Sequence, residues 1–190
     1  LKNKLGDELK KFVAEGKLII GICNGFQILV KSGLLPGNVE LEQETSLIIN
    51  DVGKFQDYWV YLKTVKTQAQ AAKCVWVKDL PEIIYLPVAH GEGKFVAKDK
   101  EVLARLKKNH QIIFQYCDDQ GSFLGYPHNP NGSEDNIAGI CDETGRILGL
   151  MPHPERNMYK EQHPRWTMKP SQPDGLQIFN NAVTYAKKYL

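Results

Sequence analysis

The order of apolar and polar residues over the first 33 positions predicts a helix, a strand and a second helix. Between residues 1 and 16 the spacing is helical, with apolar positions at Leu1, Leu5, Leu9, Phe12 and Val13. This predicts an amphipathic helix that ends at Gly16. Residues 18–22 are all apolar or glycine, as in a buried strand. Residues 24–33 return to helical spacing.

Further along, the pattern predicts short strands mixed with helices. Short strand-like runs lie within residues 47–65 and 74–88. One of the runs in the second range covers 74–77. Residues 111–117 are predicted to form a buried strand. Residues 99–110 form a helix with Asp99 as its N-cap, and 137–151 form a β-hairpin. A final helix covers 174–190, capped by Asp174, with an apolar stripe of Leu176, Phe179, Val183 and Ala186. Together these elements predict an α/β sheet covered on both faces.

Composition adds little to this picture but excludes several classes of function. Hydrophobic residues make up 42% and charged residues 24% of the chain, and the net charge is +2, as in ordinary soluble domains. There is no basic block typical of nucleic-acid binding and no apolar run near the roughly 20 residues that span a membrane. The four cysteines are scattered without a C-x-x-C pair, which argues against zinc and favours a reduced, cytoplasmic setting.

The first candidate for chemistry is Cys23, between the strand at 18–22 and the following helix. A strand, a tight turn flanked by Gly21 and Gly25, and a helix make the elbow that displays a nucleophile above a sheet. The helix N-terminus favours the reactive thiolate, and the backbone N–H of Asn24 could stabilise an oxyanion. The alternative is that Cys23 is only a small buried hydrophobe.

The second candidate is the segment "MPHPER" at 151–156. Residues before proline avoid the helical region, so the backbone around His153 should be extended. In an extended segment residues two apart face the same side, so Glu155 can orient and stabilise the His153 ring. The alternative is a surface loop with an incidental ion pair.

Taken together, Cys23, His153 and Glu155 form a candidate Cys–His–Glu triad, in which the histidine lies 130 positions after the cysteine. Papain-like proteases also pair a cysteine with a distant histidine. Their cysteine lies in a different local signature and has no such elbow, so that interpretation is disfavoured.

These motifs resemble those of the class I, triad-type glutamine amidotransferases, in "GICNGFQ" at 21–27 and "HPE" at 153–155. Four further features are similar to the glutaminase subunits of phosphoribosylformylglycinamidine synthases: Asn24 after the nucleophile, "AHGEG" at 89–93, "YPHNPNGS" at 126–133 and "GLMPHPER" at 149–156. "LLPG" at 34–37 and "DGLQIF" at 174–179 also fit. The resemblance implies a three-layer α/β/α fold with a mostly parallel central sheet and a hairpin before the His/Glu loop.

The resemblance also implies roles for individual residues. Cys23 attacks the side-chain amide of L-glutamine, His153 serves as acid and then as base, and Glu155 holds His153. Asn24, Gly25 and Gln27 are the implied substrate-binding residues. His90 and Glu92 match a family motif for which the sequence suggests no role, and no further ligand at motif spacing supports a metal site there.

A partner is implied because free ammonia in neutral water is protonated and lost as a nucleophile. The resemblance implies a large synthetase subunit, joined in some organisms by a small third subunit, which uses ATP to convert formylglycinamide ribonucleotide to the amidine in purine synthesis. No phosphate-binding glycine loop is found here, so ATP and magnesium are expected in that partner. No cofactor is expected in this chain.

We expect residues 1–190 to form a single glutamine amidotransferase domain. Strands and a glycine-rich oxyanion loop normally precede the first helix in this family, and we expect them to be missing from this sequence, which begins at Leu1. Three alternatives stay open. They are a glutaminase serving another synthetase, a non-catalytic module on the same fold, and a cysteine hydrolase acting on a peptide or a γ-glutamyl compound.

Overall fold

The computed structural model describes residues 2–37, 41–64, 73–168 and 174–190. Its α-helices are α1 (Lys2–Ala14), α2 (Asn24–Lys31), α4 (Lys100–Lys108) and α5 (Asp174–Tyr189). Its strands are β1 (Ile19–Ile22), β2 (Thr45–Ile49), β3 (Gln56–Thr64), β4 (Ile83–His90), β5 (Glu92–Ala97), β6 (Ile112–Cys117), β7 (Ile137–Cys141) and β8 (Ile147–Leu150). Its short 3₁₀ helices are η1 (Val75–Val77), η2 (Glu134–Asn136), η3 (Pro154–Arg156) and η4 (Lys160–Gln162).

Six of the strands form one sheet in the order β1-β8-β7-β6-β3-β4, and β2 pairs with β5 in a separate sheet. The α/β class and the hairpin of β7 and β8 are confirmed. The expected mostly parallel sheet is wrong for the part of the chain described: only β1 and β8 run parallel there, and the other four pairings are antiparallel. The connection between β7 and β8 is too short for the crossover that parallel neighbours need.

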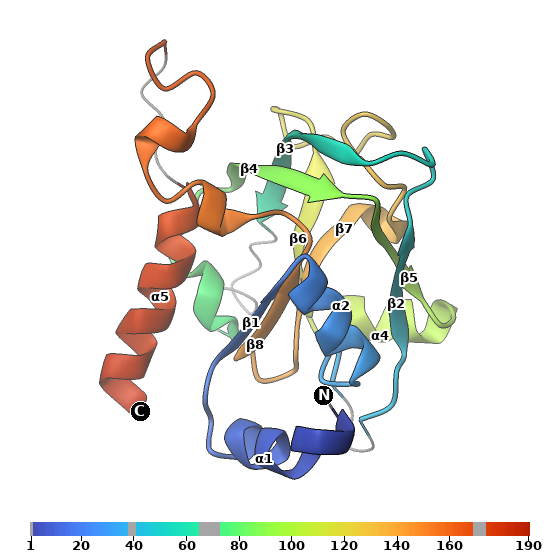
Figure 1. The fold of residues 1–190 in the computed structure, drawn as a ribbon, viewed down its shortest axis with the longest axis vertical. Helices are drawn as coiled ribbons and strands as arrows, with labels where there is room; N and C mark the ends of the chain where they lie inside the picture. The colour runs from blue at the N-terminus through green and yellow to red at the C-terminus, as the bar shows by residue number, and fades with distance from the viewer. Residues whose placement is uncertain (1, 38–40, 65–72, 169–173) are drawn as a thin grey trace.

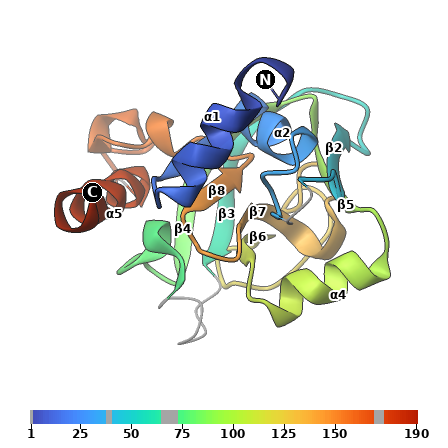
Figure 2. The same ribbon diagram turned by 90° about the horizontal axis from the view of Figure 1, so that it is seen from below.

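Helices and the small sheet cover both faces of the main sheet, which gives three layers (Figures 1 and 2). On one face, α5 and η1 pack on a core that includes Trp76, Leu86 and Ile178. On the other, α2, α4 and the β2–β5 sheet enclose a core that includes Phe26 and Leu106. These two cores fix the sheet that carries the candidate site.

Helices whose ends are set by neighbouring residues form where the sequence predicts them. Helix α1 ends before Gly16, whose φ of +77° suits glycine. The Asp99 carboxylate accepts a hydrogen bond from the Val102 N–H at 2.8 Å and caps α4. Residues 74–77 are the exception, because a 3₁₀ helix at Val75–Val77 replaces the predicted strand. Periodicity cannot assign so short an apolar run.

The apolar stripe predicted for the last helix is also wrong. The buried positions of α5 are Gly175, Ile178 and Asn181, whereas Val183 is 51% exposed. At Gly175 a Cβ atom would lie 1.9 Å from the Pro154 carbonyl oxygen, so only glycine permits this close approach. This close approach sets the rotation of α5 about its axis. The buried positions Gly175 and Ile178 therefore each lie one residue before the predicted positions Leu176 and Phe179.

Candidate active site

The turn between β1 and α2 holds Cys23 in a conformation that is unusual for a residue with a side chain. Its φ is 51° and its ψ is −107°. Its backbone N–H donates to the Leu150 carbonyl at 2.9 Å, and its carbonyl accepts from the Gln27 N–H at 3.2 Å. Such positive-φ residues cost about 1–3 kcal/mol and cluster at functional sites. The predicted elbow therefore exists, and it places the thiol at the N-terminus of α2.

The parallel pairing of β1 with β8 explains how two segments far apart in sequence meet. In the register of this pair Ile22 lies beside Leu150, at the carboxyl end of each strand. The residues that directly follow two parallel strands lie at the same edge of the sheet, because the carboxyl ends of both strands are there. Cys23 directly follows β1 and His153 follows β8 by three residues, so both lie at that edge.

Beyond β8 the backbone differs in part from the predicted extended segment. His153 is non-helical, with φ −106° and ψ 86°, as expected before proline. Pro154–Arg156 nevertheless form a 3₁₀ turn, since proline suits the first position of a helix. The two side chains still meet: the Glu155 carboxylate lies 2.6 Å from Nδ1 of His153.

The edge strand β4 anchors this loop through its backbone. The Pro87 carbonyl accepts from the His153 N–H at 2.8 Å. Two residues earlier, the Tyr85 carbonyl accepts from the Asn157 amide at 3.0 Å, and the Tyr85 N–H donates to the Asp174 carboxylate at 2.9 Å. The loop that carries His153 is therefore fixed to β4 and to the start of α5.

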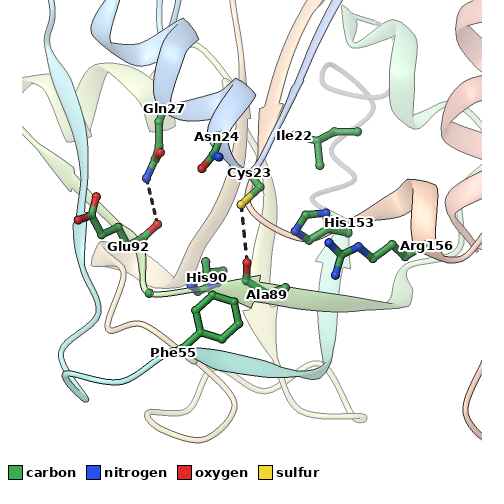
Figure 3. Close-up of a pocket in the computed structure, with 11 residues that line it drawn as sticks. Ile22, Cys23, Asn24, Gln27, Phe55, Ala89, His90, Glu92, His153 and Arg156 are labelled. Atoms are coloured by element: carbon green, nitrogen blue, oxygen red, sulfur yellow. Dashed lines mark hydrogen bonds between the residues drawn. The ribbon is translucent and has the colours of Figure 1, made fainter.

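The same strand also contacts Cys23. The Cys23 thiol lies 3.8 Å from the Ala89 carbonyl oxygen, and its sulfur points toward that oxygen in Figure 3. Strands β1 and β4 are the two edges of the six-stranded sheet, yet both contact Cys23 or His153. The sheet therefore curves until its two edges share one site.

A cavity of about 500 Å³ opens beside the thiol (Figure 3). Its lining residues come from the elbow, from the β4–β5 junction, from the loop after β8 and from Phe55. They are Ile22, Cys23, Asn24, Gln27, Phe55, Ala89, His90, Gly91, Glu92, His153 and Arg156. The volume is in the range of small-molecule sites.

Charge at the site is set by the His153–Glu155 pair. Burial opposes protonation of the His153 ring, but the Cys23 thiol and then the Glu155 carboxylate outweigh it and raise the pKa of His153 to about 9. Burial also opposes ionisation of Glu155, yet its bond to His153 dominates and its pKa is lowered. Near neutral pH the pair is an imidazolium beside a carboxylate, a form that can donate a proton to a leaving group.

The predicted site residues do not all lie in the same part of the site. Cys23, Asn24, Gln27 and His153 line the cavity, together with His90 and Glu92. Glu155 contacts His153 but does not line the cavity, and neither does Gly25.

Sequence reasoning missed several contributors to the site, among them Phe55, Arg156 and the backbone of β4. Arg156 belongs to the segment 151–156 that predicts the His153–Glu155 pair, so the sequence does contain a signal for it. Backbone carbonyls leave no signal in a sequence.

The described residues offer neither a metal site nor a membrane span. They contain no group of three or more His, Cys, Asp or Glu side chains that could hold a metal ion. No helix among them is long and apolar enough to cross a bilayer.

Residues 1–186 match the model of the CobB/CobQ-like glutamine amidotransferase domain. The chain is 43% identical over 204 aligned residues to phosphoribosylformylglycinamidine synthase subunit PurQ of Methanococcus maripaludis, covering 99% of this chain and 72% of that protein. It is 42% identical over 197 residues to the subunit of the same name from Archaeoglobus fulgidus, covering 99% and 70%.

A solved structure is also similar. It is described as PurLQS from Thermotoga maritima, and the match has a TM-score of 0.69 and 30% sequence identity over 96% of this chain and 68% of that one.

Proposed function

The chain belongs to the CobB/CobQ-like glutamine amidotransferase family, and from this premise we propose that Cys23, His153 and Glu155 hydrolyse L-glutamine through a thioester. The similarity to PurQ subunits over almost the whole chain makes it the glutaminase component of phosphoribosylformylglycinamidine synthase. The observation that carries the mechanism is the strained elbow, which holds Cys23 beside a histidine paired to a carboxylate at 2.6 Å.

In the first half of the reaction, Cys23 attacks the side-chain amide carbon of glutamine as the thiolate, the thiol proton having passed to His153. The carbonyl oxygen takes up the negative charge, and the N–H groups of the first turn of α2, beginning at Asn24, are available to stabilise it because they have no partner within the helix. Collapse of this intermediate breaks the carbon–nitrogen bond. The His153 imidazolium gives its proton to the leaving nitrogen, and ammonia departs.

In the second half, the now neutral His153 takes a proton from water. The resulting hydroxide attacks the thioester and the carbon–sulfur bond breaks. Glutamate leaves, its new carboxyl group gives its proton to water, and the Cys23 thiolate beside the His153 imidazolium is restored. Glu155 stabilises the imidazolium each time it forms. Glutamine and water are consumed, and glutamate and ammonia are produced.

The cavity supports glutamine as the substrate. The Gln27 side chain lies one helical turn from Cys23, donates to the Glu92 carbonyl at 3.1 Å and closes one wall. We assign Asn24, Gly25 and Gln27 to substrate binding. Arg156 stands on the other side of the thiol in Figure 3, so polar groups flank the reacting centre on two sides.

The ammonia is used by a synthetase subunit, with which the chain forms a complex. In our proposal that subunit converts formylglycinamide ribonucleotide to the amidine and holds the ATP and magnesium this reaction needs. The proposal also includes a small third subunit, which the solved PurLQS structure supports.

Reconstitution tests the proposal. The chain, the synthetase subunit, formylglycinamide ribonucleotide, ATP and glutamine should yield the amidine and glutamate in equal amounts. Glutamate without amidine would instead indicate a glutaminase for another synthetase. Amidine from ammonia alone, with no turnover of glutamine, would indicate a non-catalytic module. A Cys23 thioester formed with a γ-glutamyl peptide but not with glutamine would indicate a different cysteine hydrolase.

The pH dependence of the reaction should respond to Glu155→Gln. A protonated His153 is required in the free enzyme, so kcat/KM should fall as pH rises through about 9. Without the carboxylate the ring loses its proton at lower pH, so this alkaline limb should move down, and kcat should drop about 10²-fold or more. The measurement is a pH–rate profile of glutamine hydrolysis in the assembled complex. An alkaline limb in the same place as in the wild type would remove Glu155 from the triad.

A further inference from the structure

The junction between β4 and β5, residues 89–92, forms the cavity wall opposite α2. Two of its backbone carbonyls contact side chains across the cavity, those of Cys23 and Gln27. The Ala89 carbonyl lies 3.8 Å from the Cys23 sulfur. The Glu92 carbonyl accepts from the Gln27 side chain at 3.1 Å. The position of this wall therefore sets the width of the cavity beside the Cys23 thiol and the Gln27 side chain.

One buried residue, Asn50, directly follows β2 and binds this wall through hydrogen bonds. Only 2% of Asn50 is exposed. Its amide nitrogen donates to the His90 carbonyl at 2.9 Å and to the Lys54 carbonyl at 3.1 Å. Its backbone N–H donates to the Gly91 carbonyl at 3.0 Å. The two carbonyls between the catalytic contacts are thus both bound by Asn50.

The His90 side chain completes this arrangement. Its Nδ1 lies 3.2 Å from the Asn50 side-chain oxygen, and the ring is 3% exposed. Because the Asn50 nitrogen already donates twice, its oxygen must be the atom that faces the ring, so Nδ1 carries the proton. Burial, and then the charge of His153, lower the pKa of His90 to about 4, so the ring stays neutral.

The ring itself is confined by Gly93. A Cβ atom at Gly93 would lie 2.7 Å from Nδ1 of His90. Nε2 of His90 is buried and makes no hydrogen bond within the described part of the chain. The fixed, neutral His90 ring therefore interacts with Asn50 through one hydrogen bond, which its Nδ1–H donates.

We propose that Asn50 and His90 are positioning residues, which hold the 89–92 wall at the distance from Cys23 and Gln27 that glutamine binding requires. Neither side chain takes part in proton transfer. This inference rests on the proposed glutaminase function, because it assigns a role within the same site.

The test uses the complex assembled with the synthetase subunit and compares three substitutions of His90. An asparagine at position 90 can place an N–H where Nδ1 stands, a glutamine places its amide where Nε2 stands, and an alanine places neither. We expect His90→Ala and His90→Gln to raise the KM for glutamine about tenfold, as loss of a buried hydrogen bond implies, and to leave kcat within about threefold. His90→Asn should keep a KM close to that of the wild type.

Asn50→Ala should behave like His90→Ala. Asn109→Ala is its control, because the Asn109 side chain makes a surface hydrogen bond to Glu143 at 3.0 Å and lies away from the cavity. Its KM should be unchanged. Amidine synthesis from added ammonia bypasses the site and should be normal in every variant, which reports correct folding and assembly.

Two results would overturn the inference: an unchanged KM in His90→Ala, or rescue by glutamine rather than asparagine, which would make Nε2 the working atom. Should the alanine variant not fold, the comparison of His90→Asn with His90→Gln decides alone. Cys23→Ala separates this inference from the proposed function. If that variant still uses glutamine, the glutaminase site itself is wrong. If it does not, the His90 results test the positioning role only.

Discussion

Cys23→Ala should abolish glutamine-dependent synthesis of the amidine and leave synthesis from added ammonia intact. In the proposed mechanism the sulfur forms the covalent bond to the substrate, and no other group in the cavity lining can replace it. Loss of a nucleophile of this kind lowers kcat by more than about 10³-fold. In our proposal the ammonia reaction takes place in the partner and does not need the thiol. The measurement is amidine formation with each nitrogen donor in turn.

Cys117→Ala is the matched control. Cys117 ends β6 in the core, and burial raises the pKa of its thiol to about 11, so it is not ionised at neutral pH. This variant should keep both activities. An electrophilic glutamine analogue should likewise label Cys23 and spare Cys117. Equal loss of the glutamine and ammonia activities in Cys23→Ala would show that the substitution disturbs assembly and would not support a nucleophile.

Gly21→Ala should be among the most damaging single substitutions, whereas Gly25→Ala in the same motif should be tolerated by the fold. A Cβ at Gly21 would lie 2.5 Å from the Leu29 side chain and 2.7 Å from the Gly25 carbonyl carbon and oxygen. The backbone of α2 cannot yield without moving the elbow. We expect a loss of about 2–3 kcal/mol in the free energy of unfolding, with a large fall in kcat.

At Gly25 an added Cβ meets nothing within 4 Å. Alanine is the better helix former, so Gly25→Ala should keep or raise stability by up to about 1 kcal/mol. Denaturant unfolding of the two variants gives the comparison, and equal destabilisation would contradict it. The KM for glutamine then tests Gly25 itself. A rise supports its place on the substrate's path, and an unchanged value removes it from the substrate-binding set.

The features that could be predicted from the sequence are those in which a local pattern decides the conformation. Residues 24–31 form a helix because their apolar positions share one face, and Asp99 caps α4 through its own side chain. The elbow at Cys23 follows from a strand, a glycine and a helix in direct succession. The pairing of His153 with Glu155 was predicted too, although through an extended backbone where the structure has a 3₁₀ turn.

The remaining features depend on contacts between distant segments. The sheet order, and with it the antiparallel pairing of β4 with β3, comes from packing that no short window contains. Pro87 and Ala89 contribute only backbone carbonyls to the site, and a carbonyl gives no hint in a sequence. Asn50 reads as a polar residue after a strand until its partners across 40 positions are known. The site's supporting contacts were therefore harder to predict than its reacting groups.

The meeting of β1 and β4 at one site has a consequence for local unfolding. Any opening that parts these two edges breaks the His153 N–H bond to Pro87 and the thiol contact to Ala89 in one event. Nucleophile, base and cavity wall would then be lost together, with one opening free energy. The exchange rate of the His153 amide hydrogen measures that free energy directly. A covalent glutamine analogue on Cys23 would occupy the cavity that Ile22 of β1 and Ala89 of β4 both line, and it should slow this exchange more than that of the amides in α1.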